Sequence, residues 1–87
     1  QIPHIDPRET RRVMILRMRS VPALDITALN SLARLWKECQ RHRVQLILSH
    51  VNEQPLSVMR KSGFYEAVGE EWFCPNIDTA LELASKL

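Results

Sequence analysis

An aspartate and a threonine stand at the expected start of a helix, and their residue types suit anion chemistry at that position. The segment 21–29 runs from an extended apolar stretch, across a turn, into an amphipathic helix. Asp25 is placed to be the N-cap, because its carboxylate can accept hydrogen bonds from first-turn amides. Leu24 and Leu29 then occupy the two positions of a hydrophobic staple. Thr27 falls in the first turn, where we expect its hydroxyl near the surface.

Two interpretations of this junction stay open. Asp25 and Thr27 are ordinary capping residues in the first. In the second they form an anion or phosphorylation site, since unpaired amides and the helix dipole favour negative charge at a helix start. A phosphate on Thr27 would add about −1.5 to −2 charges, which the helix would tolerate and a docked partner would not. Asp25 would partly offset the benefit of the dipole through like-charge repulsion.

Other residue patterns give little support for catalysis, metal binding or a cofactor. The chain has no Gly-rich phosphate loop, no G-x-S-x-G segment and no pair of carboxylates on converging elements. Cys39 and Cys74 are far apart and form no C-x-x-C pair, so we expect buried thiols in a reducing compartment. The histidines, His4, His42 and His50, lack metal-ligand spacing. We therefore expect neither an enzyme nor a metal or cofactor site.

Length and composition indicate one small globular domain. The chain has 87 residues, 45% of them hydrophobic, and two glycines, so it can form a single domain with a limited core. No apolar run approaches the roughly 20 residues that cross a bilayer, and the polar amino terminus does not resemble a signal peptide. We expect a soluble chain.

The net charge of +2 hides an asymmetry between the two halves. Residues 1–43 hold nine Arg and Lys against four acids, and residues 44–87 hold three against six. The basic positions could form a solvated face, or could meet an acidic partner or anionic lipid headgroups: Arg8, Arg11, Arg12, Arg17 and Arg19. Surface aromatics are not interleaved with these cations, so nucleic acid is not an expected partner.

The first half of the chain predicts two parallel strands joined by a helix. Residues 1–11, with two prolines, are expected to be an irregular lead-in or linker. An unbroken apolar run at 13–16 predicts a strand over 12–19 that is covered on both faces. Helical spacing of apolar residues predicts a helix over 25–42, and a second buried strand follows at 44–49. This order gives a right-handed βαβ unit.

The second half predicts two more helices and a short strand. Pro55 is expected at the first position of a helix that ends at Gly63, with Phe64 packing on Met59. Trp72 and Phe73 could form a short edge strand that Pro75 ends. Asn76 should cap a last helix with a packed stripe made of Ile77, Ala80, Leu81, Ala84 and Leu87. Three helices and one short strand can hardly cover both faces and both edges of two central strands. We therefore expect part of the sheet to be missing on the amino-terminal side.

The order of elements and three stretches resemble the STAS domain, which is found in anti-sigma factor antagonists and at the cytoplasmic carboxyl end of SulP-type anion permeases. The stretches are residues 21–29, residues 51–64 and residues 69–81. The last one is more similar to the permease branch, where a Gly-Glu-Glu segment, an aromatic, a proline and an Asp-x-Ala-Leu helix start commonly close the domain.

The resemblance implies an α/β fold of the STAS (anti-sigma factor antagonist-like) type, a mostly parallel β-sheet with packed helices. Residues 12–87 would be its carboxyl-terminal portion, without the usual first strands and first helix. In the antagonists, an Asp-Ser-Ser/Thr-Gly turn is phosphorylated on its second hydroxyl residue. Asp25, Ile26, Thr27 and Ala28 match that turn, so Thr27 is the implied phosphoacceptor. Ile26 and Ala28 depart from the pattern, which fits the permease branch.

We therefore expect a cytoplasmic regulatory and protein-interaction STAS domain of a membrane sulfate-type anion transporter, at the cytoplasmic face of the inner membrane. The implied partners are the transmembrane portion of the same permease, a cytoplasmic regulatory protein and the anionic membrane surface, with absent strands or another chain completing the sheet. The expected interaction or anion-binding surface is Asp25, Thr27, Asn30 and Arg34. The alternative is a stand-alone anti-sigma factor antagonist regulated by phosphorylation of Thr27.

Overall fold

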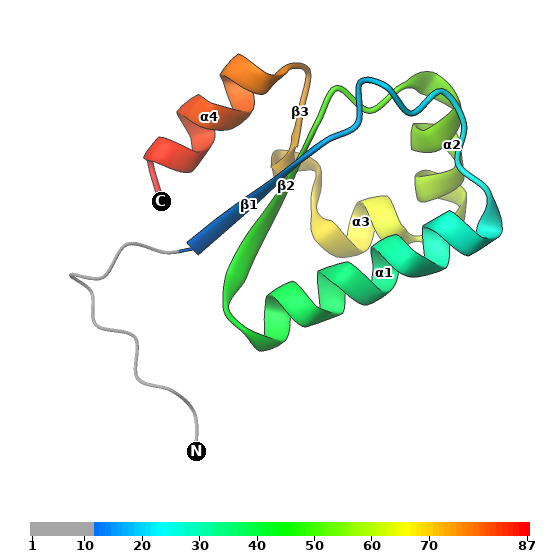
Figure 1. Ribbon diagram of the computed structural model, residues 1–87, viewed down its shortest axis with the longest axis horizontal. Coiled ribbons are helices and arrows are strands. Elements are labelled where there is room, and N and C mark those ends of the chain that lie inside the picture. The colour runs from blue at the N-terminus through cyan, green and yellow to red at the C-terminus, as the bar shows by residue number, and fades with distance from the viewer. Residues whose placement is uncertain (1–11) are drawn as a thin grey trace.

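A three-stranded parallel sheet lies at the centre of the structure. The computed structural model describes residues 12–87 (Figure 1), so the lead-in predicted for residues 1–11 lies outside the described residues. The strands follow the order β1-β2-β3: β1 Arg12–Arg17, β2 Val44–Ser49 and β3 Phe73–Cys74. Both neighbouring pairs are parallel, as the predicted βαβ unit requires.

Helices cover both faces of this sheet. Figure 1 shows α1, α2 and α3 on one side of the strands and α4 on the other. The helical elements are α1 Ile26–Arg41, α2 Glu53–Ser62, α3 Phe64–Val68, the 3-10 helix η1 Glu70–Trp72, and α4 Ile77–Ser85. The described chain is thus a three-layer α/β arrangement.

The strand β2 supplies the centre of both cores. Leu46, Ile47 and Leu48 are at most 1% exposed. Leu46 and Leu48 belong to the cluster under α1, α2 and α3, whereas Ile47 packs with Ala80 on the α4 side. Successive side chains of a strand point to opposite faces, so an unbroken apolar run is what a strand covered on both faces requires.

The strand β1 is less covered than the sequence predicted. It ends at Arg17 rather than Arg19, and Met14 is 39% exposed. Val13 and Ile15 are partly buried against the α4 side. The prediction of a strand covered on both faces was wrong for β1 because it lies at the edge of the described sheet, where neighbouring helices reach only part of each face.

The helix α1 follows the prediction closely, and α2 begins earlier than predicted. Asp25 is the N-cap of α1, which ends at Arg41. Asn52 is the N-cap of α2, so Pro55 is its third residue rather than its first. A proline is still tolerated there because the first amides of a helix have no partner within the helix. Gly63 ends α2 in the left-handed region at φ +88°, as predicted.

The chain after Gly63 differs most from the prediction. Phe64 joins the core cluster of Met59, but it also begins α3, a helix too short to produce a periodic signal. The Phe64 N–H donates a hydrogen bond to Ser62 Oγ at 3.3 Å. Trp72 lies in η1, so the short strand contains Phe73 and Cys74 instead of Trp72 and Phe73.

The last helix confirms the predicted cap and corrects the predicted stripe. Asn76 Oδ1 accepts a hydrogen bond from the Thr79 N–H at 2.8 Å. Ala80 is fully buried, but Leu81 is 54% exposed, and Leu83 packs on the sheet instead. The sequence spacing allowed either leucine, and contact with the sheet selects Leu83.

The contrast between two leucines tests this arrangement. Leu48→Ala should lower the free energy of unfolding by about 2–5 kcal/mol, because it leaves a cavity at a fully buried position. Leu81→Ala should change it by less than about 0.5 kcal/mol. Urea denaturation followed by circular dichroism measures both. Equal effects of the two substitutions would contradict the described core.

Candidate functional site

The start of α1 is held by its N-cap. Asp25 Oδ1 accepts a hydrogen bond from the Ala28 N–H at 2.8 Å, and the Asp25 carbonyl accepts one from Leu29 N–H at 2.9 Å. Leu24 and Leu29 on either side are buried, so the predicted staple positions both lie in the core. These contacts confirm the predicted capping role of Asp25 and fix the direction of the helix.

The four residues predicted as a surface are all exposed. Thr27, Asn30 and Arg34 follow one another at helical spacing on the outward face of α1, and Asp25 lies at its cap. Ile26, beside them, is 70% exposed. The structure therefore places these side chains on one accessible surface, which we call the α1 start surface (Asp25, Ile26, Thr27, Asn30 and Arg34). Its role as an interaction surface or phosphorylation site stays a prediction.

The loop that leads into this surface is held by two amide side chains from the start of α2. Asn52 Nδ2 lies 2.9 Å from the Val21 carbonyl, 3.1 Å from that of Arg19 and 3.4 Å from that of Met18. An amide has two N–H groups, so these three acceptors share two donors. The loop after β1 is thereby tied to the residues after β2.

Gln54 makes the second tie, to the residue before the cap. Its Oε1 accepts from the Leu24 N–H at 2.7 Å, and its Nε2 lies 3.5 Å from the Leu24 carbonyl. We call Asn52 and Gln54 together the amide latch. Neither residue was predicted from the sequence. The available signal was their position directly after the second strand, because the carboxyl ends of parallel strands meet at the same edge of a sheet.

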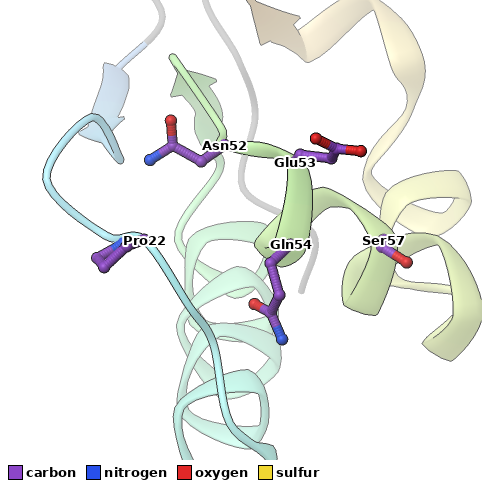
Figure 2. Close-up of a pocket in the computed structure, with 5 residues that line it drawn as sticks. All are labelled: Pro22, Asn52, Glu53, Gln54 and Ser57. Atoms are coloured by element: carbon purple, nitrogen blue, oxygen red, sulfur yellow. The ribbon is translucent and has the colours of Figure 1, made fainter.

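An open hollow of about 650 Å³ lies beside the amide latch. Figure 2 shows Pro22 on the loop across from the start of α2, where the other lining residues lie: Asn52, Glu53, Gln54 and Ser57. Ligands of open α/β sheets often bind at this edge. Here the two amides are used to hold the loop, and within residues 12–87 Ser57 has no hydrogen bond to a base, so the hollow shows no acid–base pair.

The two thiols lie on opposite sides of the sheet. Cys39 belongs to the cluster under α1, α2 and α3, and Cys74 to the cluster under α4. Both are free and buried. Burial raises the pKa of the Cys39 thiol, with a smaller contribution from the Glu38 carboxylate, and burial raises the pKa of Cys74. No group of three potential metal ligands is found within the part of the chain that the structure describes.

Residues 4–80 match the STAS domain family. The chain belongs to this family. It is 30% identical over 70 residues to "Probable sulfate transporter 4.2" and 31% identical to "Sulfate transporter 4.1, chloroplastic", both from Arabidopsis thaliana. Each alignment covers 80% of this chain and 10% of the relative, so the chain spans about a tenth of the length of these curated relatives.

A solved structure supports the same assignment. The crystal structure of a sulfate transporter family protein from Wolinella succinogenes superposes with a TM-score of 0.82 at 38% identity, covering 90% of this chain and 64% of that one. The predicted STAS fold of the sulfate transporter type is therefore confirmed. The relatives carry transporter names, so they add no support to the anti-sigma antagonist alternative. The domain boundary predicted at residue 12 stays a prediction.

A substitution in the amide latch tests its role. Asn52→Ala should lower the free energy of unfolding by about 1–3 kcal/mol, because it leaves backbone carbonyls without their donor. It should also speed hydrogen exchange of the amides in residues 19–24. Asn30→Ala, the same change on the outward face of α1, should alter stability by less than about 0.5 kcal/mol. Unchanged exchange in that loop would show that Asn52 does not hold it.

The buried thiols should react slowly in the folded domain. At pH 8 the raised pKa values and the burial of Cys39 and Cys74 should make modification by Ellman's reagent at least about 100-fold slower than in denaturant. Because burial raises both pKa values above that of a free thiol, the contribution of the two thiols to stability is complete below the free-thiol pKa and is lost as the pH rises through the folded pKa. Thiols that react equally fast in the native and unfolded states would contradict this description.

Proposed function

We propose that this STAS domain is a regulatory and protein-interaction module of a membrane sulfate-type anion transporter, on the cytoplasmic side of the membrane. The observation that carries the proposal is the likeness, over 90% of this chain, to a solved sulfate transporter family protein. Among residues 12–87 no helix is long and apolar enough to span a bilayer. Transport itself would belong to a membrane portion outside these residues.

The α1 start surface is the part of the domain we propose for partner contact. Its side chains project from a regular helix rather than from a loop. The Asp25 cap and the amide latch hold the chain that enters this helix. A surface held in one conformation loses little conformational freedom when a partner binds. The proposed partners are the membrane portion of the same transporter and a cytoplasmic regulatory protein.

Thr27 is the proposed point of control within this surface. It is exposed and is the second residue of α1, where amides without a helical partner favour a negative charge. A phosphate there would leave the helix intact and would introduce two new features at the contact, charge and bulk. A partner that covers Thr27 and the exposed Ile26 would then be displaced.

Sulfate uptake by the full-length transporter that contains this domain tests the proposal. Thr27→Glu should change uptake by about fivefold or more, which corresponds to roughly 1 kcal/mol at the contact. Thr27→Val is the matched control, because it removes the hydroxyl without adding charge, and should stay within about twofold of the unmodified protein. Both variants must reach the membrane in equal amounts, as measured by immunoblotting. Uptake that is unchanged in Thr27→Glu would remove this surface from the proposal.

A further inference from the structure

A row of cations runs along the outward face of α1. Arg34, Lys37 and Arg41 are exposed and follow one another at steps of three and four residues, which places them on one side of a helix. They span about 10 Å along the axis. Arg43 is also exposed, two residues beyond Arg41. We call these four residues the basic stripe.

The basic stripe is not cancelled by nearby acids. The ion pairs within residues 12–87 are Arg41 with Glu38 at 2.7 Å and Lys86 with Glu82 at 3.8 Å. Glu38 is the sole acid of α1, and its pair with Arg41 is open to solvent, with side chains 50% and 73% exposed. The stripe and Glu38 together therefore keep a charge of about +3 on this face.

The end of the sheet near this stripe adds one more cation. Arg12 begins β1 and is paired in register with Val44, the residue after Arg43. It is exposed. Among the other basic positions that the sequence singled out, Arg8 and Arg11 lie outside the described residues. Arg17 and Arg19 are exposed at the opposite end of β1.

The layer on the other side of the sheet carries exposed acids. Asp78 and Glu82 lie on α4, and the exposed Lys86 at its carboxyl cap pairs with Glu82. Figure 1 shows α4 across the sheet from α1. A negatively charged surface would attract the α1 face and repel the α4 face, so this distribution of charge also selects an orientation.

We propose that the basic stripe binds the anionic surface of a lipid bilayer and holds the domain with α1 against the membrane. This inference deepens the proposed function and rests on it, because the domain would be tethered close to a bilayer. The stripe lies on a convex helix face, and the hollow of the domain lies elsewhere, beside the amide latch. A broad charged surface can meet such a face without a complementary cleft.

An exposed apolar residue lies in the same row. Ile26, Asn30, Arg34, Lys37 and Arg41 occupy positions i, i+4, i+8, i+11 and i+15 of α1. Ile26 is 70% exposed and can enter the headgroup region when the basic residues contact the lipid phosphates. The row therefore combines several cations with one apolar residue that can contact the same bilayer surface.

The expected binding is weak but sufficient for a tethered domain. Each cation near an anionic bilayer raises the partition coefficient about fivefold. Tethering to a membrane portion would make the contact intramolecular, so that a weak contact is populated because of its high effective concentration. The domain would then lie on the membrane or leave it as salt and lipid charge change.

Vesicle binding by the 87-residue chain tests the proposal. Vesicles of phosphatidylcholine with about 30 mol% phosphatidylserine should sediment the chain at least about tenfold better than vesicles of phosphatidylcholine alone. The binding should fall steeply between about 0.1 M and about 0.5 M salt. Absence of binding to the phosphatidylserine vesicles at low salt would overturn the proposal.

Two triple variants separate the effect of the basic stripe on vesicle binding from the effect of the net charge of the chain. Arg34→Gln/Lys37→Gln/Arg41→Gln should lose at least about tenfold in vesicle binding. Arg60→Gln/Lys61→Gln/Lys86→Gln removes the same charge from α2 and the end of α4 and should stay within about threefold. Equal losses in both variants would contradict a specific surface. Circular dichroism verifies that both triples fold.

A third experiment, with polyglutamate, distinguishes a membrane from an acidic protein as the partner of the basic stripe. Polyglutamate should bind less tightly than vesicles at equal charge concentration, because it offers no apolar layer for Ile26, whereas binding of polyglutamate without binding of vesicles would overturn the lipid assignment. The assay uses no membrane portion and no Thr27 variant. Failure of vesicle binding would therefore leave the uptake result intact, and an unchanged uptake in Thr27→Glu would leave the vesicle result intact.

Discussion

The packing of β2 on both of its faces is the constraint on which the other layers depend. Leu46 and Leu48 pack in the core on the side of α1, α2 and α3, and Ile47 packs in the core on the side of α4. Burial of each such side chain contributes about 1.5–3 kcal/mol. A small domain buries a smaller fraction of its surface than a large one, so each buried side chain matters more to its stability. Both helical layers therefore use the same six-residue strand, and the position of α1 relative to the sheet follows from it.

Parallel pairing then determines which loops can meet. The residues after β1 and after β2 emerge at the same edge, and the amide latch joins them through the backbone of residues 18–24. This edge is also where α1 begins. The loop would otherwise expose backbone carbonyls at a bend beside the core, and Asn52 and Gln54 supply donors for them. The surface proposed for partner contact thus depends on side chains from a different helix.

Two properties of α1 bear on the proposed function, and the surfaces that carry them share Arg34. At its start, the cap and the unpaired amides tolerate negative charge on Thr27. Along its remaining length, the basic stripe attracts negative charge from outside. A membrane-bound orientation would leave the start of the helix near the lipid boundary. A change at Thr27 and a change in lipid charge could therefore influence the same contact.

Local signals in the sequence were sufficient to predict the helices and strands but not every side-chain contact. Asp25, Asn76 and Gly63 act over a few residues, and the structure confirms each as a helix boundary. The resemblance to the STAS domain, carried by three stretches of sequence, also predicted the family that the comparison of residues 4–80 confirms. The start of α2 was misplaced by two residues because Pro55 is allowed at any of the first helical positions.

The tertiary structure decided what depends on neighbours far along the chain. Leu81 and Leu83 are equally apolar, and contact with the sheet determines which one is buried. Met14 is partly exposed because β1 lies at the edge of the described sheet. Asn52 and Gln54 act on residues about thirty positions earlier, a distance over which no periodicity operates. The sequence by itself determined the helix caps, the buried central strand and the family, since these rest on local hydrogen bonding and apolar patterning. The latch arose only when parallel pairing brought distant segments to a common edge.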